Sequence, residues 1–471
     1  MMRSTKIVAT IGPASSEPAV LERMVEEGMD VARLNFAHGD VESHAETARR
    51  LRAAAEKVGR RVAILGDVPG PKLRLGPIAD GVTEVPTGSS LVLTTRDVLG
   101  DSECLPVAWD GLSDLVQAGD VVYLADGAIR LRVMSTSPEE VVTEVEAGGS
   151  VASRQGLNLP NVTTTLPTTS ADDLALIDTG LEMGVDMLAL SFVRTADDLQ
   201  PVREHLLSRG SDVPLIAKIE KPQAAASAEA IIDSADAIMV ARGDLGIELP
   251  IEQVPLVQKR LLVLAGRKAV PAITATQMLE SMVNATRPTR AEVADVANAI
   301  FDGTDAVMLS QETAVGNHPI EAVHMMSQIA KSTERELPYG RWLAERGPQA
   351  NNQHHAIAFG AVGAVYQLGL KAIVCPTRSG ATARLVSSYR PRAPVLALCT
   401  DPAVMRRCAL LWGVRATMRE EATDTLDLLE QCAAAAVEEG LAEKGDKIGI
   451  TAGLPPGRSG GTNLFKVHDV E

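Results

Sequence analysis

The chain has 471 residues, more than one hydrophobic core normally contains, so two or three domains are expected. Its net charge of −16 leaves no basic stripe that would neutralise nucleic-acid phosphates, and we expect no nucleic-acid partner. No apolar run reaches the roughly 20 residues of a membrane helix and no signal-peptide pattern precedes the first strand, so we expect a cytoplasmic protein without a membrane partner.

Eight short runs rich in Val, Ile, Leu and Ala occur along the chain, most of them separated by helix-like stretches. Near-continuous apolar strands that alternate with helices are typical of a parallel sheet covered on both faces. Eight such strands predict a closed (β/α)8 TIM barrel, whose active site lies at the carboxyl ends of the strands. The predicted strands are Lys6–Gly12, Asp30–Phe36, Val62–Val68, Met187–Val193, Leu215–Glu220, Ala237–Arg242, Ala269–Thr276 and Ala306–Glu312.

Boundary signals predict where two barrel helices begin. Ser15 or Ser16 is expected to cap the first helix, Pro18 to lie in its first turn and Gly28 to end it. A later helix is predicted to begin with a capping box at Thr289–Glu292.

The barrel pattern is interrupted between the third and fourth strands, so we assign the barrel to residues 1–70 and 167–345. Residues 71–166 contain short Val-, Thr- and Leu-rich runs between Gly, Pro and Asp, which predict a small all-β domain. Because the insertion follows a strand end at the catalytic face, we expect it to act as a lid. Its predicted strands include Ser90–Thr95, Val121–Ala125, Ile129–Met134 and Val141–Val145.

A polar stretch, Glu345–His355, is predicted to be a linker. Beyond it, residues 355–471 alternate short apolar strands with helical stretches, which predicts an open C-terminal α/β domain. The predicted strands are Ala372–Thr377, Val395–Thr400, Gly413–Met418 and Lys447–Gly453.

A lysine and two carboxylates follow the fifth and sixth barrel strands. Lys218 and Glu220 are two residues apart on one strand, so both side chains point to the same face, and Asp244 follows the next strand. Two carboxylates leave most of a coordination shell open, which suits Mg²⁺ or Mn²⁺ completed by substrate oxygens and water. The alternative is a lysine–carboxylate ion pair that closes the barrel.

Other polar residues end neighbouring strands. Arg33 and Asn35 end the second strand, Arg74 lies just past the third, and Thr276 ends the seventh. One arginine side chain can bind two phosphate oxygens at once. The Thr276 hydroxyl is placed to orient a substrate or relay a proton. The alternative is that Thr276 is an ordinary β-branched strand residue without a role in the reaction. Without a P-loop or a dinucleotide-binding fingerprint, side chains and metal would have to hold nucleotide phosphates.

Long motifs occur in one order along nearly the whole chain, at Lys6–Pro13, Ala32–Gly39, Gly70–Arg74, Ala217–Lys221, Met239–Glu248, Ile273–Met282 and Pro288–Thr313. In these segments the chain closely resembles the pyruvate kinase family. The resemblance implies transfer of the phosphoryl group of phosphoenolpyruvate to ADP in glycolysis, which gives pyruvate and ATP. It also implies a homotetramer.

The resemblance assigns catalytic roles to three residues of this chain. It implies that Arg33 contacts the phosphoryl group, that Lys218 lies against it during transfer, and that Thr276 serves the proton path to the enolate. Thr276 and the backbone around Gly243 would grip the substrate carboxylate.

The resemblance also implies two metal ions and a nucleotide side. Glu220 and Asp244 would hold the protein-bound Mg²⁺ beside the substrate, and a second Mg²⁺ would arrive with ADP. Asn35, His38 and Arg74 would lie on the nucleotide side.

Three positions depart from the potassium-dependent members of the family. Asn35 and Asp67 are retained at the site where those members bind K⁺, but Ala37 and Val68 replace a serine and a threonine. Lys72 stands where those members carry glutamate. Because a monovalent cation site needs its oxygens, we hypothesise that K⁺ is not required and that the Lys72 ammonium replaces it. The alternative is that K⁺ binds through waters and Lys72 is a loop lysine.

In the C-terminal domain, one segment follows a strand and opens a helix, where hydroxyls and backbone N–H groups form an anion site. The family places its allosteric site here, so we predict a regulatory domain that binds a phosphorylated effector. The alternative is an ordinary helix cap. The predicted effector-binding residues are Thr377, Arg378, Ser379, Gly380 and Thr382.

Two other functions compete with this prediction. A metal-dependent aldolase or lyase acting on a pyruvate enolate would explain Glu220 and Asp244, but not Arg33, Arg74, the lid or the third domain. A non-catalytic regulator would keep the barrel, but a decayed site would normally lose one of its active-site residues.

Overall fold

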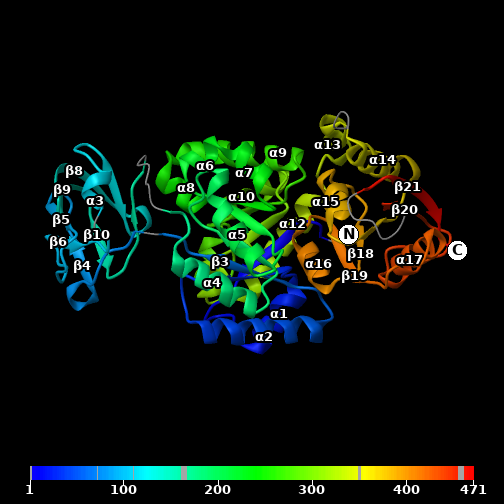
Figure 1. Cartoon of the computed structure of the whole chain (residues 1–471), viewed down its shortest axis with the longest axis horizontal. Helices are drawn as coiled ribbons and strands as arrows, with labels where there is room; N and C mark the ends of the chain where they lie inside the picture. Colours follow the sequence, from blue (N-terminus) through cyan, green and yellow to red (C-terminus); the bar gives the residue numbers. More distant parts are fainter. Residues whose placement is uncertain (1–2, 72, 110, 161–166, 348–351, 454–460) are drawn as a thin grey trace.

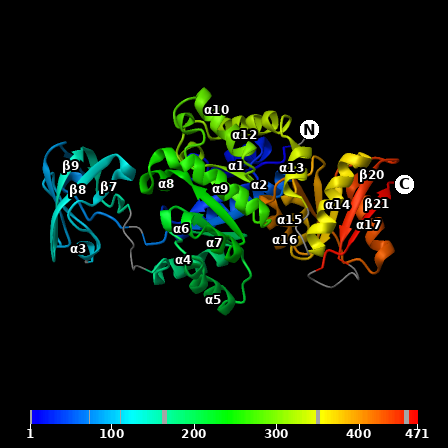
Figure 2. The same ribbon diagram turned by 90° about the horizontal axis from the view of Figure 1, so that it is seen from above.

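The computed structural model describes residues 3–71, 73–109, 111–160, 167–347, 352–453 and 461–471. Three parts lie in a row: a β-sheet part at one end, a barrel in the middle and the C-terminal part at the other end (Figure 1). A view turned by 90° shows the same order (Figure 2).

The central part is a closed barrel of eight parallel strands, in the order β1-β16-β15-β14-β13-β12-β3-β2. The side chains of these strands are almost entirely buried, as expected for a parallel sheet wrapped by helices. The predicted (β/α)8 fold is therefore confirmed. The strands are β1 (Lys6–Thr10), β2 (Val31–Asn35), β3 (Ala63–Val68), β12 (Met187–Leu190), β13 (Leu215–Ile219), β14 (Ala237–Ala241), β15 (Ala272–Ala275) and β16 (Ala306–Leu309).

Helices surround the barrel. The longer helices pack an apolar stripe on the barrel core, as Leu21, Met24 and Val25 of α1 do. The helices are α1 (Pro18–Glu27), α2 (Val41–Val58), α4 (Ala171–Glu182), α5 (Gln200–Ser208), α6 (Pro222–Ala226), α7 (Ala228–Ser234), α8 (Arg242–Glu248), α9 (Val254–Arg267), α10 (Arg290–Phe301), α11 (Gln311–Ala314), α12 (Pro319–Glu334) and α13 (Tyr339–Arg346).

One capping prediction is wrong. Neither Ser15 nor Ser16 caps α1, because its N-cap is Glu17, which makes no side-chain capping bond. Ser15 is buried instead and its hydroxyl accepts a hydrogen bond from the Gly12 backbone N–H at 3.2 Å. Pro18 does begin the helix and Gly28 follows its last residue. The capping box at the start of α10 is confirmed.

The chain between β3 and β12 forms an all-β part, as predicted. A six-stranded sheet has the order β11-β7-β8-β9-β5-β6, and we call it the inserted sheet; β10 and β4 form a separate pair. The inserted sheet has its own apolar core. Its elements are β4 (Val82–Val85), β5 (Ser90–Thr94), β6 (Cys104–Pro106), α3 (Leu112–Leu115), β7 (Val121–Leu124), β8 (Ile129–Ser137), β9 (Glu140–Ala147), β10 (Gly149–Ala152) and β11 (Leu157–Asn158), with a 3₁₀ turn, η2, at Ala125–Gly127.

The C-terminal part is an α/β sheet in the order β19-β18-β17-β20-β21. The four predicted strands are present, but the sequence analysis missed β21, which pairs antiparallel with β20 at the edge. Its polar residues hide the strand pattern. The elements are α14 (Gln353–Leu368), β17 (Ile373–Thr377), α15 (Ala381–Ser388), β18 (Val395–Cys399), α16 (Pro402–Arg407), β19 (Val414–Met418), α17 (Thr425–Glu438), β20 (Lys447–Ala452) and β21 (Leu464–Asp469).

A buried ion pair fixes the C-terminal part to the barrel. The Arg390 guanidinium donates to the Asp305 carboxylate at 2.6 Å and to the Gly303 carbonyl at 2.5 Å. It also lies 5.1 Å from the centre of the Trp412 ring. The other Asp305 oxygen accepts the Ala272 backbone N–H at 2.9 Å, so the carboxylate is tied to the start of a barrel strand.

We expect Arg390→Met to destabilise the protein by about 3–5 kcal/mol, because the Asp305 carboxylate would stay buried without its cation. The thermal unfolding midpoint measures the loss. Arg341→Met is the control, since Arg341 makes only an exposed pair with Glu345, and it should leave the midpoint unchanged. Equal midpoints for both variants would contradict the role of the buried pair.

Candidate active site

Lys218 lies at the centre of a group of charged side chains in the barrel mouth. Its ammonium is 2.8 Å from a Glu220 oxygen and 3.2 Å from an Asp67 oxygen, and it donates to the Ser191 hydroxyl at 2.7 Å. Burial alone would lower the pKa of Lys218, but Asp67 and Glu220 raise it above its usual value, with a smaller contribution from Asp244. Lys218 is therefore charged at neutral pH.

Asp67 holds a second cation beside Lys218. The Arg33 Nε donates to an Asp67 oxygen at 2.6 Å, and Arg33 also donates to the Thr10 hydroxyl at 3.0 Å. Burial would raise the pKa of Asp67, whose side chain is 1% exposed, but Lys218 and Arg33 hold that pKa below its usual value. The structure thus brings Arg33, Asp67, Lys218 and Glu220 together, two cations and two carboxylates at one side of the barrel mouth.

The expected metal ligands follow two neighbouring strands. Glu220 comes directly after β13 and is buried, and one of its oxygens accepts the Phe192 backbone N–H at 2.8 Å. Asp244 lies in the first turn of α8, after β14. The described residues contain no cluster of three or more acidic, His or Cys side chains. Two carboxylates nevertheless fit Mg²⁺, which keeps several positions for water and substrate oxygens.

Thr276 and Gly243 are in direct contact. The Gly243 backbone N–H donates to the Thr276 hydroxyl at 2.7 Å, and the hydroxyl donates to the Ala275 carbonyl at 2.6 Å. Thr276 and Gln277 both have positive φ, 69° and 54°, so the chain turns sharply where β15 ends. This turn, rather than an extended strand, carries the hydroxyl, and the predicted strand Ala269–Thr276 is accordingly shorter.

The sequence analysis missed Arg242, which supports this turn. Its guanidinium donates to the carbonyls of Ala275 at 3.3 Å and Thr276 at 2.9 Å and pairs with Asp295 at 2.7 Å. Its position at the end of the predicted strand Ala237–Arg242, directly before Gly243, was the available signal. Arg242 orients the turn that carries Thr276.

The sequence analysis also missed two polar residues after β16. Glu312 is fully buried and accepts the Leu279 and Ser310 backbone N–H groups at 3.0 Å and 2.6 Å. The buried Ser310 hydroxyl has no hydrogen-bond partner among the residues that the structure describes. Glu312 thus joins the backbone that follows β15 to the backbone that follows β16, next to the Thr276 turn.

The residues assigned to the nucleotide side are more exposed. The Asn35 side chain accepts the Ala37 backbone N–H at 3.3 Å. His38 is exposed, and its carbonyl accepts a hydrogen bond from the His44 ring at 2.7 Å. The Arg74 side chain donates to the Arg154 carbonyl at 3.2 Å. Lys72 lies outside the described residues.

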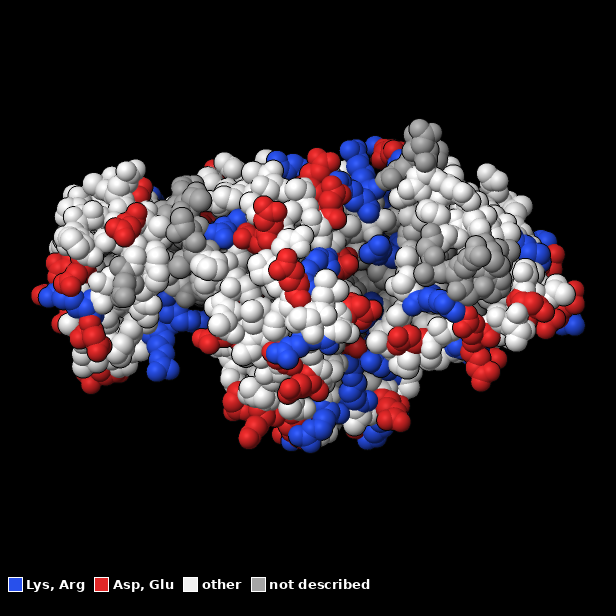
Figure 3. Space-filling view, in the orientation of Figure 1, with Lys and Arg blue, Asp and Glu red and all other residues white. Residues whose placement is uncertain are grey.

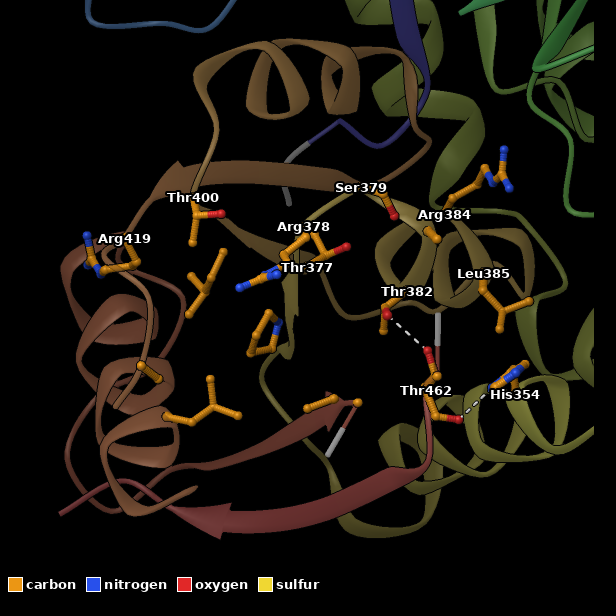
Figure 4. Close-up of a pocket in the computed structure, with 18 of the residues that line it drawn as sticks. His354, Thr377, Arg378, Ser379, Thr382, Arg384, Leu385, Thr400, Arg419 and Thr462 are labelled. Carbon is orange, nitrogen blue, oxygen red and sulfur yellow. Dashed lines mark hydrogen bonds between the residues drawn. The ribbon is translucent and has the colours of Figure 1, made fainter. Parts of the chain in front are cut away.

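A second site is a cavity of about 340 Å³ in the C-terminal part (Figure 4). Thr377, Arg378, Ser379 and Thr382 line it, as do the side chains of Arg419 and His354. Gly380 has φ 81°, and its backbone N–H donates to the Thr377 hydroxyl at 2.9 Å. No side chain caps α15, so the capping alternative is wrong for this helix.

Acidic and basic side chains are mixed over the face in Figure 3, without a continuous basic stripe. Among the described residues, no helix is long and apolar enough to cross a membrane.

The fold is that of a (β/α)8-barrel enzyme, with lysine, arginine and carboxylate side chains grouped at the mouth of the barrel. Comparison with known proteins identifies the family. Residues 2–323 match the family description "Pyruvate kinase, barrel domain", and residues 355–468 match "Pyruvate kinase, alpha/beta domain". The chain belongs to the pyruvate kinase family, whose enzymes transfer phosphate from phosphoenolpyruvate to ADP.

Individual relatives agree over the full length. The chain is 45% identical to a pyruvate kinase of Geobacillus stearothermophilus, over 99% of this chain and 80% of the relative. It is 42% identical to that of Thermococcus litoralis, over 99% and 98%. A crystal structure of a pyruvate kinase from Cryptosporidium parvum superposes with a TM-score of 0.93 at 35% identity, over 100% and 96%. These matches exclude the two alternatives, a lyase and a non-catalytic regulator.

We expect Asp67→Asn to destabilise the protein at pH 7 by about 3–5 kcal/mol, since it leaves Arg33 and Lys218 with one carboxylate fewer. The pKa of Asp67 is lower in the folded than in the unfolded protein. Its contribution is therefore present above the unfolded pKa, near 4, and is lost as the pH falls through the folded pKa. Urea midpoints of both proteins from pH 7 to 3 should converge at the acid end. A gap that stays constant would contradict the pairing.

Proposed function

We propose that this chain is a glycolytic pyruvate kinase in which Arg33 and Lys218 bind the phosphoryl group of phosphoenolpyruvate. The observation that carries this proposal is the Lys218 ammonium, held in the barrel mouth by Asp67 and Glu220 within 3.2 Å. Phosphoryl transfer depends mainly on positioning and on offsetting the negative charge of three oxygens. Two fixed cations in a largely buried site supply both at little reorganisation cost.

Thr276 and Gly243 would bind the other end of the substrate. The hydrogen bond between them places a hydroxyl and the first turn of α8 side by side. Arg242 fixes the turn from behind. A substrate carboxylate would take the Gly243 N–H and the Thr276 hydroxyl as donors. The same hydroxyl, through water, would return a proton to the enolate.

Glu220 and Asp244 would hold Mg²⁺, or Mn²⁺, beside the substrate. When bound, this ion would stabilise negative charge on the phosphoryl and enolate oxygens. Glu220 is oriented for that role by the Phe192 N–H.

The nucleotide, ADP or the product ATP with its own Mg²⁺, would lie between the mouth and the inserted sheet. Asn35, His38 and Arg74 are proposed to contact it. Residues 71–166 would then act as the lid, residues 1–70 and 167–345 as the catalytic domain, and residues 355–471 as the regulatory domain.

Lys218→Met should lower pyruvate formation at least about a hundredfold, because one preorganised charge at the phosphoryl group is lost. The rate is measured with phosphoenolpyruvate, ADP and Mg²⁺, and circular dichroism checks the fold. Lys259→Met is the control, since Lys259 is exposed on α9 and pairs with Asp302. Near-native turnover of Lys218→Met would rule out the role, and a wild type that forms no pyruvate would rule out the function.

We also propose that the enzyme does not require K⁺ and that Lys72 supplies the missing charge. Both Asp67 oxygens already accept from cations, Arg33 and Lys218, and the Asn35 oxygen accepts a backbone N–H. Ala37 and Val68 offer no side-chain oxygen. The oxygens of Asp67 and Asn35 that the structure describes are thus arranged for fixed side-chain cations rather than for a bound K⁺.

In K⁺-free buffer we expect a high wild-type rate that added K⁺ barely changes. Lys72→Glu should lose at least about tenfold without K⁺, the cost of one charged contact, and recover when K⁺ is added. Lys57→Glu, a change of an exposed lysine on α2, is the matched control. A Lys72→Glu enzyme that stays fully active without K⁺ would contradict the replacement.

The C-terminal cavity is the proposed site of a phosphorylated effector. Backbone N–H groups at the start of α15 have no side-chain cap, and the Thr382 hydroxyl contacts that of Thr462 at 2.9 Å. Arg378 pairs with Glu421 across the cavity. A phosphate would accept hydrogen bonds from the hydroxyls of Thr377, Ser379 and Thr382. Arg378, Gly380 and Thr462 would complete the site.

A homotetramer is supported by an apolar surface. Ile251, Leu256 and Val263 lie in and just before α9 and are at least half exposed. Contiguous exposed apolar residues on a soluble protein mark interaction sites. We propose that this face of α9 contacts a second copy of the chain.

A further inference from the structure

The two elements that carry the proposed metal ligands are joined to each other by a buried ion pair. Lys221 directly follows Glu220, and Glu248 is the last residue of α8, which begins with the turn that holds Asp244. The Lys221 ammonium lies 2.5 Å from a Glu248 oxygen. Glu248 is 4% exposed, so it depends on Lys221 to offset its charge.

The inserted sheet reaches this ion pair. The Asn158 side-chain amide of β11 donates to the same Glu248 oxygen at 3.4 Å. Beside it, Gly127 of η2 packs against Ile247 of α8. Asn158 is 3% exposed, and its side-chain carbonyl has no hydrogen-bond partner among the described residues. We call Asn158, Glu248 and Lys221 the clasp.

The clasp also connects to Glu220 by a second route. The Lys221 ammonium lies 5.7 Å from the centre of the Phe192 ring, within reach of a cation–π interaction. The Phe192 backbone N–H donates to Glu220, and Phe192 has φ 58°, so its backbone is held in an uncommon conformation. These contacts link Lys221 to Glu220 through Phe192, and α8 links Glu248 to Asp244.

We propose that Asn158 is a positioning residue for the reaction, and that the clasp couples closure of the inserted sheet to the carboxylates Glu220 and Asp244. This inference rests on the proposed function, in which the nucleotide lies beneath the sheet. At 3.4 Å the Asn158–Glu248 hydrogen bond is long. Closure over a nucleotide shortens it and aligns α8, so that closure of the sheet and binding at Glu220 and Asp244 favour each other.

The first test follows coupling without relying on turnover. Hydrogen–deuterium exchange is measured on the full chain with and without phosphoenolpyruvate and Mn²⁺, which bind on the barrel side. In the wild type, these ligands should slow exchange in residues 121–128 and 157–160 of the inserted part. In Asn158→Ala, the slowing should be confined to the barrel, including α8. Equal protection of the inserted part in both proteins would overturn the coupling.

The second test separates positioning from a structural role. Asn158→Ala should lower kcat/KM for ADP about tenfold, the effect of one hydrogen bond to a charged group, with affinity for phosphoenolpyruvate retained. Asn158→Asp places a second carboxylate against Glu248 and should lower kcat/KM for ADP further than Asn158→Ala does. Adding Glu248→Gln to Asn158→Asp restores a donor–acceptor pair and should recover part of the loss. Absence of recovery would contradict the contact as the cause.

Gln117→Ala, a change of an exposed amide in the inserted part, is the control and should behave as the wild type. An inactive wild type would refute the proposed function, whereas exchange would still decide the coupling. An active wild type with unchanged kinetics and exchange in Asn158→Ala would refute the clasp alone.

Discussion

The buried charges at the barrel mouth must offset one another, and much of the structure depends on this constraint. Lys218 and Arg33 have no bulk water to screen them, so Asp67 and Glu220 lie within hydrogen-bonding distance. The group comes from the ends of three strands, with Arg33 on β2, Asp67 on β3, and Lys218 and Glu220 at the end of β13. Only a closed parallel barrel brings these ends to one place, because all its strands point the same way. The site is therefore a property of the barrel as a whole.

A second layer of residues holds this group in place. Arg242 supports the Thr276 turn, Glu312 fixes the backbone after β15 and β16, and the Phe192 N–H orients Glu220. Several of these positions have backbone angles that side-chain residues rarely adopt, at Phe192, Thr276 and Gln277. Such strain persists where surrounding contacts over-determine the conformation. These three residues lie just after β12 and β15, where the chain leaves the barrel sheet.

The barrel connects in two directions to other parts of the chain. Arg390 fixes the C-terminal sheet through two buried hydrogen bonds, one to the Asp305 carboxylate and one to the Gly303 carbonyl. The inserted sheet is held more lightly, by the long bond of Asn158 and by packing at Ile247. This difference in contact suits their proposed roles. A regulatory part must transmit small shifts through a firm junction, whereas a lid must open and close.

The sequence by itself determined the eight strands, the all-β insertion, the C-terminal α/β part and the family, because apolar periodicity and long ordered motifs are local properties. It also placed Lys218 next to Glu220, since alternate residues of a strand share a face. It missed β21, whose polar edge residues hide the strand pattern, and it assigned the α1 cap wrongly because Ser15 is buried. Only the tertiary structure showed that Asp67 is shared by Arg33 and Lys218, that Arg242 and Glu312 support the site, and that Asn158 meets Glu248. Those contacts join residues 33 to 151 positions apart in the sequence, and such pairings depend on how the elements pack rather than on any pattern within one element.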